Sequence, residues 1–310
     1  MLRPALLDCL PCCDDLVIAV TCALPDGDYG RRLRVKSVTY QNDIDDWLAG
    51  RIRSVAGPEG WATLVGLYWF KEGDNRFGSD KDNDLVLANP DLPANVGVFT
   101  LAGSEVRFRV GPGADVRSGG RPVTSLILVT DPDSTVLTHG SVSFYVIRRG
   151  PRFGLRVKDS SAEARTHFKG FAYFPLNQKW RLEARFVPYS PMRQIRTINV
   201  VGMDENMASP GALEFHVDGK LYRLDTVLEH GEADYFVMFA DMTNGKQTYG
   251  AGRFLYVKPP LDGVTVLDFN KSYNPPCAFS PYATCPLPPP QNRLPIAVEA
   301  GELRYADADY

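Results

Sequence analysis

The sequence predicts a mainly β protein, built as two packed antiparallel β lobes with one short N-terminal helix. Three observations predict this fold. Apolar residues come in short runs, and several runs alternate apolar with polar residues, which is the period of a half-buried strand. Glycine, proline, aspartate and asparagine separate these runs. Helical spacing is sustained in one stretch, which precedes them.

The predicted helix covers residues 43–55, where apolar side chains recur at helical spacing. Asp43 can cap its first turn, and the Gly-Pro-Glu-Gly segment at 57–60 ends it. Residues 1–40 show no sustained periodicity. We expect them to form an irregular or disordered leader outside the fold.

The leader holds four of the chain's six cysteines: Cys9, Cys12, Cys13 and Cys22. The first three, Cys9, Cys12 and Cys13, have a spacing typical of metal ligands. No second Cys/His pair follows at the distance found in zinc fingers, so free thiols are expected. Asp14 and Asp15 precede the short apolar stretch of this segment. A secretory signal has positive charge there, so a cytoplasmic protein is expected.

The first lobe is expected over residues 41–150, as the helix followed by a β-sandwich. Its strands are predicted at residues 62–69, 77, 85–87, 96–101, 106–110, 125–129, 134–137 and 142–147. Its turns and strands resemble the strand order of a forkhead-associated (FHA) sandwich. The motifs that carry this resemblance lie at residues 72–80, 83–87, 115–123, 137–140 and 144–146.

An FHA fold would imply binding of phosphothreonine peptides. FHA domains place an arginine after the first glycine, where this chain has Ser79, and a Ser-x-x-His stretch follows it. Residues 88–97 contain neither serine nor histidine. Without the arginine there is no charge-assisted pair for a phosphate, so a phosphopeptide partner is not expected.

The second lobe is expected over residues 151–310, with the boundary near Arg149 to Gly154. Asp218-Gly219 is a typical two-residue hairpin turn. A Pro/Cys-rich loop, residues 268–295, is expected to close this lobe, because its prolines exclude a regular helix or a central strand. Its strands are predicted at residues 154–157, 180–186, 195–201, 212–217, 220–224, 234–239, 252–257 and 264–269.

Composition excludes several classes of function. The chain has 310 residues, of which 44% are hydrophobic and 23% charged, so it can bury a core. A net charge of −3 argues against a nucleic-acid partner, which requires a concentrated basic face. No run reaches the roughly 18 apolar residues that span a bilayer. No glycine-rich loop lies between a strand and a long helix, so no nucleotide cofactor is expected.

Over residues 41–310 the chain resembles a bacterial family known as domain of unknown function 1684 (DUF1684). This resemblance implies an architecture and no established activity. The stretches that carry it are residues 60–67, 77–79, 148–150, 171–175, 241–245, 248–253, 268–270 and the Pro/Cys run to Leu294.

The candidate site is the Pro/Cys-rich loop together with the turn before it, because a rigid loop dense in polar side chains is a typical place for binding or chemistry. Arg253 begins an otherwise apolar strand, so it is expected to pair with Asp241 or Asp268. That arginine is interpreted either as the partner of a ligand's negative group or as a buried ion pair that orients the loop. The ligand-binding candidates are Arg253, Asn270, Tyr273, Asn274, Asn292 and Arg293.

The loop cysteines, Cys277 and Cys285, allow four interpretations: a disulfide, a metal site, a nucleophile at Cys277, or small buried thiols. The four histidines form no ligand-spaced pair near them, and no metal is expected. The leading hypothesis is binding of a small polar or anionic ligand. The alternatives are a hydrolase or lyase with Asp241 or Asp268 as general base, and a structural or protein-interaction module. The catalytic candidates are therefore Asp241, Asp268 and Cys277.

Overall fold

The computed structural model describes residues 39–305, so the predictions for the leader and its four cysteines lie outside the described residues. The prediction of a mainly β fold with one N-terminal helix is confirmed. Helix α1 spans Tyr40–Ala56, close to the predicted 43–55. Residues 47–305 belong to one compact unit.

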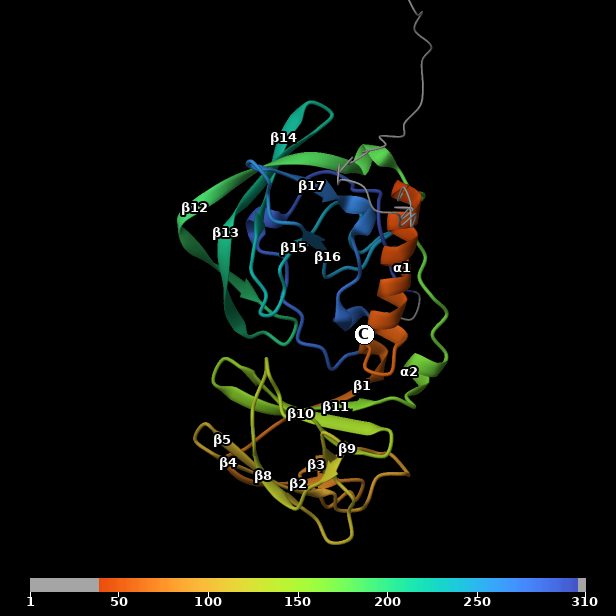
Figure 1. Cartoon of the computed structure of the whole chain (residues 1–310), viewed down its shortest axis with the longest axis vertical. Coiled ribbons are helices and arrows are strands. Elements are labelled where there is room, and N and C mark those ends of the chain that lie inside the picture. The colour runs from red at the N-terminus through yellow and green to blue at the C-terminus, as the bar shows by residue number, and fades with distance from the viewer. Residues whose placement is uncertain (1–38, 306–310) are drawn as a thin grey trace, which may run out of the picture. The chain divides into compact units, whose positions relative to one another are not determined.

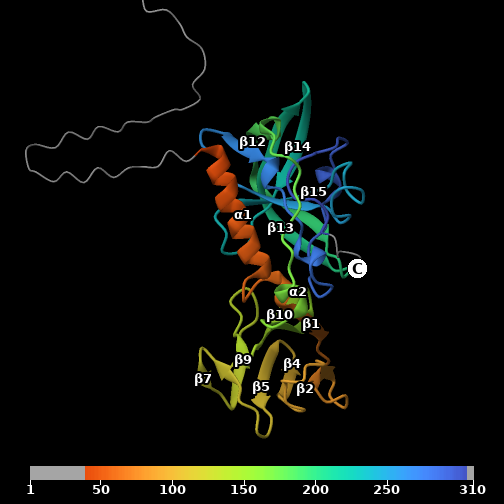
Figure 2. The ribbon, with the colours of Figure 1, turned by 90° about the vertical axis from the view of Figure 1, so that its right-hand side faces the viewer.

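The first lobe is a sandwich of two sheets, which Figure 1 shows stacked on each other. One sheet has the order β1-β11-β10-β9-β6-β7, and the other has the order β3-β2-β4-β5-β8. Strands β2, β4 and β5 lie side by side in Figure 2. Pairing is antiparallel except between β2 and β3. The strands are β1 Leu64–Trp69, β2 Gly73–Gly78, β3 Leu85–Val86, β4 Gly97–Ala102, β5 Glu105–Val110, β6 Arg117–Ser118, β7 Arg121–Pro122, β8 Ser125–Leu128, β9 Leu137–His139, β10 Val142–Arg149 and β11 Arg152–Asp159.

Alternating side chains of the two sheets meet in one aromatic core. Strand β5 shows the pattern: Val106 and Phe108 are buried while their neighbours face solvent. The ring centroids of Phe99 and Phe108 lie 4.6 Å apart, and Phe144 of the opposite sheet packs edge-on against Phe77 at 5.3 Å. This core extends into β11, whose Leu155 and Val157 belong to it.

The sandwich therefore continues past the boundary expected near Arg149 to Gly154. Strands β10 and β11 form a hairpin across that position, with Arg149 opposite Arg152. Gly150 turns the chain with a φ of 57°. The sequence contains a turn there, and the turn joins two strands of one sheet.

The second lobe is built on a four-stranded antiparallel sheet of order β14-β13-β12-β17, whose long strands β12 and β13 curve through Figure 1. The hairpin β15–β16 packs on it, and side chains of both sheets share one core around Phe239 and Phe269. The predicted turn at Asp218-Gly219 joins β13 to β14, with positive φ at both residues. The strands are β12 Arg181–Ile198, β13 Asp204–Val217, β14 Lys220–Thr226, β15 Tyr235–Phe239, β16 Arg253–Val257 and β17 Val264–Asp268.

The remaining helical pieces are short. Helix α2 covers Glu163–Thr166. The 3-10 turns are η1 Trp61–Thr63, η2 Gln178–Trp180, η3 Phe269–Lys271, η4 Pro276–Ala278 and η5 Pro290–Asn292. Three of these turns lie in the Pro/Cys-rich segment, and most residues of that segment are buried.

Candidate functional site

Arg253 and Asp241 form an ion pair inside the second lobe. Nη2 of Arg253 lies 2.6 Å from Oδ2 of Asp241, and both side chains are fully buried. The guanidinium also donates to the carbonyls of Val298, at 2.8 Å, and Ala300. The other oxygen of Asp241 accepts from the amide and the hydroxyl of Thr243 at 2.7 and 2.6 Å, which closes the predicted turn. Arg253 thus pairs with Asp241, as expected, and reaches no surface.

Asp268 lies in a different place. Its carboxylate caps turn η3 by accepting from the amide of Asn270 at 3.1 Å. The side chain of Asn270 pairs with the backbone of Asn177, which it contacts as donor at 3.0 Å and as acceptor at 3.1 Å. These two predicted site residues therefore anchor the start of the loop to the segment before β12.

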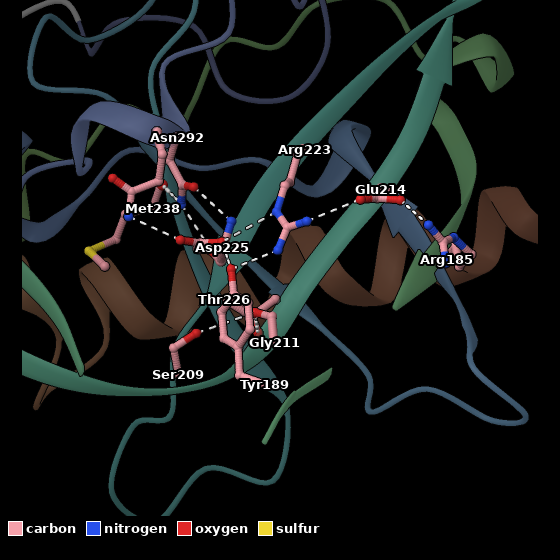
Figure 3. Close-up of polar contacts among 11 residues, drawn as sticks. Arg185, Tyr189, Ser209, Gly211, Glu214, Arg223, Asp225, Thr226, Met238 and Asn292 are labelled. Atoms are coloured by element: carbon pink, nitrogen blue, oxygen red, sulfur yellow. Dashed lines mark hydrogen bonds and ion pairs between the residues drawn. The ribbon is translucent and has the colours of Figure 1, made fainter. Parts of the chain in front are cut away.

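Asn292 ties the end of the loop to the sheet, as Figure 3 shows. Its Oδ1 accepts from the amide of Asp225 at 2.7 Å, and its Nδ2 donates to the carbonyls of Asp225 and Met238 at 2.9 and 2.8 Å. The Asp225 carboxylate accepts in turn from the hydroxyl of Tyr189 at 2.7 Å. Asn292 is buried and links β14 to β15, whereas its neighbour Arg293 is exposed.

Cys277 and Cys285 are free, buried thiols that lie against each other. The amide of Cys277 donates to Sγ of Cys285 at 3.2 Å. A hydrogen bond from the Cys285 thiol lowers the pKa of Cys277, while burial raises the pKa of Cys285. Both cysteines pack in an apolar cluster with Phe236 and Phe254.

Tyr273 and Asn274, the two remaining candidates, line a cavity of about 540 Å³. The sheet side of this cavity follows from strand alternation. Phe254 and Tyr256 point to the same face of β16, and Phe236 of β15 is the register partner of Tyr256. Tyr273 pairs with Phe254 through two backbone hydrogen bonds of 2.9 Å, which adds its ring to the same wall.

The opposite wall is one face of α1. Trp47, Gly50, Arg51 and Ser54 recur at the three- and four-residue spacing that aligns side chains along a helix. Half of the lining residues are aromatic. The complete set is Trp47, Gly50, Arg51, Ser54, Trp61, Glu229, Glu232, Phe236, Phe254, Tyr256, Tyr273, Asn274, Pro276 and Phe279.

The only basic residue in this lining is already neutralised. Arg51 donates to both carboxylate oxygens of the buried Glu302, at 2.8 and 3.3 Å, and to Ser54 at 2.8 Å. Its guanidinium carbon lies 4.3 Å from the centre of the Tyr273 ring. Asn274 supports this arrangement, because its backbone N–H donates to the Glu302 carboxylate at 2.8 Å.

The acidic side of the cavity consists of Glu229 and Glu232. The hydroxyl of Tyr256 donates to Glu229. Burial raises the pKa of Glu229 above its ordinary value, and the bond from Tyr256 opposes that rise. Burial likewise raises the pKa of Tyr256, so this phenol remains a hydrogen-bond donor at neutral pH.

Tyr273 and Asn274 were predicted as ligand-binding residues and line this cavity, whereas its other lining residues were not predicted. Trp47 and Arg51 lie on the predicted helix, where the pair of a tryptophan and an arginine on one face was the available signal. Glu229 carries no local signal, because only the fold brings the loop after β14 to that helix.

Within residues 39–305, no three His, Cys, Asp or Glu side chains gather closely enough to hold a metal ion. None of the helices in this range is both long and apolar enough to cross a membrane.

The family model described as "Protein of unknown function (DUF1684)" matches residues 166–303. A similar solved structure is the solution NMR structure of an uncharacterized protein of Haloarcula marismortui. It is 31% identical, and the match covers 46% of this chain and 80% of that chain with a TM-score of 0.39. No curated protein matches the chain.

FHA domains are also among the similar structures. The FhaA FHA domain, solved in complex with an intracellular domain, is 15% identical over 30% of this chain and 97% of that chain, with a TM-score of 0.22. A domain from a study of phosphothreonine-dependent FHA interactions is 16% identical, and the match covers 31% of this chain and 96% of that chain with a TM-score of 0.23. The family model confirms the predicted resemblance over residues 166–303: this part of the chain matches the DUF1684 proteins of unknown function.

Proposed function

We propose that this protein binds a small organic molecule in the aromatic cavity between α1 and β15–β16. The observation that carries the proposal is the cavity itself. Its volume of about 540 Å³ lies within the range typical of small-molecule sites, about 300–1,000 Å³. A few polar groups among many aromatic ones are also typical of such sites.

Gly50 supports this proposal. Glycine inside a helix costs about 1 kcal/mol relative to alanine. A Cβ at Gly50 would meet only Nη2 of Arg53, at 3.9 Å, so packing does not require glycine there. Since Gly50 lines the cavity, the missing side chain leaves room for a bound molecule.

The proposed site differs from the one expected from the sequence for a small polar or anionic ligand. That expectation assigned the ligand's negative group to Arg253, whose side chain is fully buried against Asp241. We therefore propose Tyr273 and Asn274 as binding residues, and structural roles for Arg253, Asn270 and Asn292. Arg293 is exposed and is not among the residues that line the cavity.

Filling the cavity tests the proposal. A library of small metabolites is screened by thermal shift against the wild type, Gly50→Leu and Ala49→Leu. The Gly50→Leu side chain enters the cavity, whereas Ala49 is exposed on the same helix and serves as the matched control. We expect compounds that stabilise the wild type and Ala49→Leu but not Gly50→Leu. Equal stabilisation of Gly50→Leu would place the binding site elsewhere.

The enzyme alternative has one supporting observation. A carboxylate with a raised pKa beside a cavity is typical of general acid–base sites, and Glu229 is such a group. Asp241 and Asp268, the expected general bases, are bonded inside the lobe and do not line this cavity. If the protein is a hydrolase or lyase, Glu229→Gln will abolish turnover of a ligand that the screen identifies. Binding of that ligand, which Gly50→Leu prevents, will remain measurable in Glu229→Gln.

A further inference from the structure

We propose that the ligand is an organic cation, an ammonium group carrying alkyl or aromatic substituents, held between the aromatic walls and the carboxylates of Glu229 and Glu232. This inference deepens the proposed function and rests on it. It is carried by three features of the cavity: the adjoining aromatic rings, the excess of negative charge, and the internal pairing of its only guanidinium.

The rings form a continuous wall. The centroids of Phe236 and Phe254 lie 4.8 Å apart, and those of Phe236 and Tyr256 lie 5.3 Å apart. Tyr256 and Tyr273 stack at 6.2 Å with an interplanar angle of 18°. Aromatic faces attract cations through the ring quadrupole, and alkylated ammonium groups are favoured because they shed water easily.

The fold already uses this attraction at the same wall. The guanidinium of Arg51 lies 4.3 Å from the centre of the Tyr273 ring and 5.2 Å from that of Phe171. One face of Tyr273 is therefore occupied by a cation of the protein itself. The stacked neighbour, Tyr256, is 36% exposed, so its ring is available to a second cation.

The charges select the same class of ligand. Arg51 is balanced by Glu302, which is fully buried behind it. Glu229 and Glu232 have no ion-pair partner among the described residues. Two carboxylates thus face the cavity without a countercharge. An anionic ligand would meet both of them and no free guanidinium, whereas a cation would supply the missing countercharge.

Glu229 is also positioned for this role. The hydroxyl of Tyr256 donates to one of its oxygens, which holds the carboxylate at the edge of the ring that a cation would cover. A cation on Tyr256 is then attracted by the ring face and by the carboxylate together. We expect these attractions to favour a cation over its neutral isostere by about tenfold or more in Kd.

Matched probes test the charge alone. Isothermal titration measures the Kd of choline and of its neutral analogue, in which a tert-butyl group replaces the trimethylammonium group. Phenethylammonium and phenethyl alcohol form a second pair. The variants are Glu229→Gln and, as an exposed carboxylate that does not line the cavity, Glu183→Gln.

We expect at least one cation to bind about tenfold more tightly than its neutral partner. Glu229→Gln should remove most of that preference and leave the Kd of the neutral partner unchanged, while Glu183→Gln should behave like the wild type. The inference is overturned if neither cation binds more tightly than its partner, including the case in which neither binds. That outcome does not contradict the proposed function, because the thermal-shift screen with Gly50→Leu tests for binding in the cavity whatever the charge of the compound.

Discussion

Replacing Arg253 with methionine should destabilise the protein severely, although the residue lies outside the proposed ligand cavity. Methionine keeps the apolar stem of the side chain but removes the guanidinium. The Asp241 carboxylate, 0% exposed, then loses the partner that lies 2.6 Å away. The carbonyl of Val298 also loses a donor at 2.8 Å.

The magnitude follows from the burial of the pair. Breaking a buried ion pair by removing one partner costs about 3–5 kcal/mol, because the other charge stays in a low-dielectric environment. Two hydrogen bonds from Thr243 to the Asp241 carboxylate reduce this cost but cannot balance its negative charge. Each kcal/mol lowers the Tm of a domain of 150–250 residues by about 2–4 °C, so a fall of roughly 6–20 °C is expected.

Urea unfolding followed by circular dichroism measures the effect. The variants are Arg253→Met, Asp241→Asn and the double variant, with Arg107→Met as the control because its pair with Glu105 is half exposed. We expect the control to lose less than about 1 kcal/mol. The double variant should lose less than the sum of the two single variants, because neither residue then leaves an unbalanced charge. A loss in Arg253→Met no greater than that of the control would refute the reasoning.

Two further predictions concern the cavity and the loop around it. Burial raises the pKa of Glu229 in the folded protein. Its contribution to stability is therefore present at pH values below its ordinary pKa of 4.5, and it is lost as the pH rises through the higher pKa of the folded state. Glu229→Gln should therefore raise the Tm at neutral pH, and the gain should shrink on acidification towards pH 4.5; a constant gain at all pH values would contradict this cause. Gly301→Ala should cost about 1–3 kcal/mol. Its φ is 79° and a Cβ would lie 2.4 Å from the carbonyl oxygen of Ser272. The same urea titration measures this loss, and an unchanged midpoint would show that the backbone can relax there.

The fold class was predictable because it depends on local periodicity. The helix and most strands lie close to their predicted places, since alternation and turn residues act over short distances. Two strands were predicted where the structure has β12, at residues 180–186 and 195–201, and Pro188 and Pro191 lie between them. The structure keeps one strand, Arg181–Ile198, and absorbs the prolines in an irregularity between Pro188 and Arg193. Prolines are tolerated at such bulges, because the ladder there requires no amide donor.

The cavity was less predictable, because its walls come from segments far apart in the sequence. Tyr273 and Asn274 could be identified by residue type alone. The tryptophan and arginine on one helix face were too weak a signal to identify Arg51, since a helix with an arginine on its partly apolar face is common. Its role follows only from its contacts with Glu302 and Tyr273. Glu229 acquires its raised pKa through burial, which no sequence pattern encodes.

The polar residues of the Pro/Cys-rich segment have a physical explanation that does not involve a ligand. An irregular segment cannot satisfy its backbone groups through a ladder or a helix, and when it is buried it must find other partners for them. Asp268 caps one turn, Asn270 bonds to the backbone of Asn177, and Asn292 completes the backbone hydrogen bonds of two strands. A polar, proline-rich loop therefore indicates a binding site only when the loop is exposed. In this protein most of that loop is interior, and its polar side chains hold the wall that presents Tyr273 to the cavity.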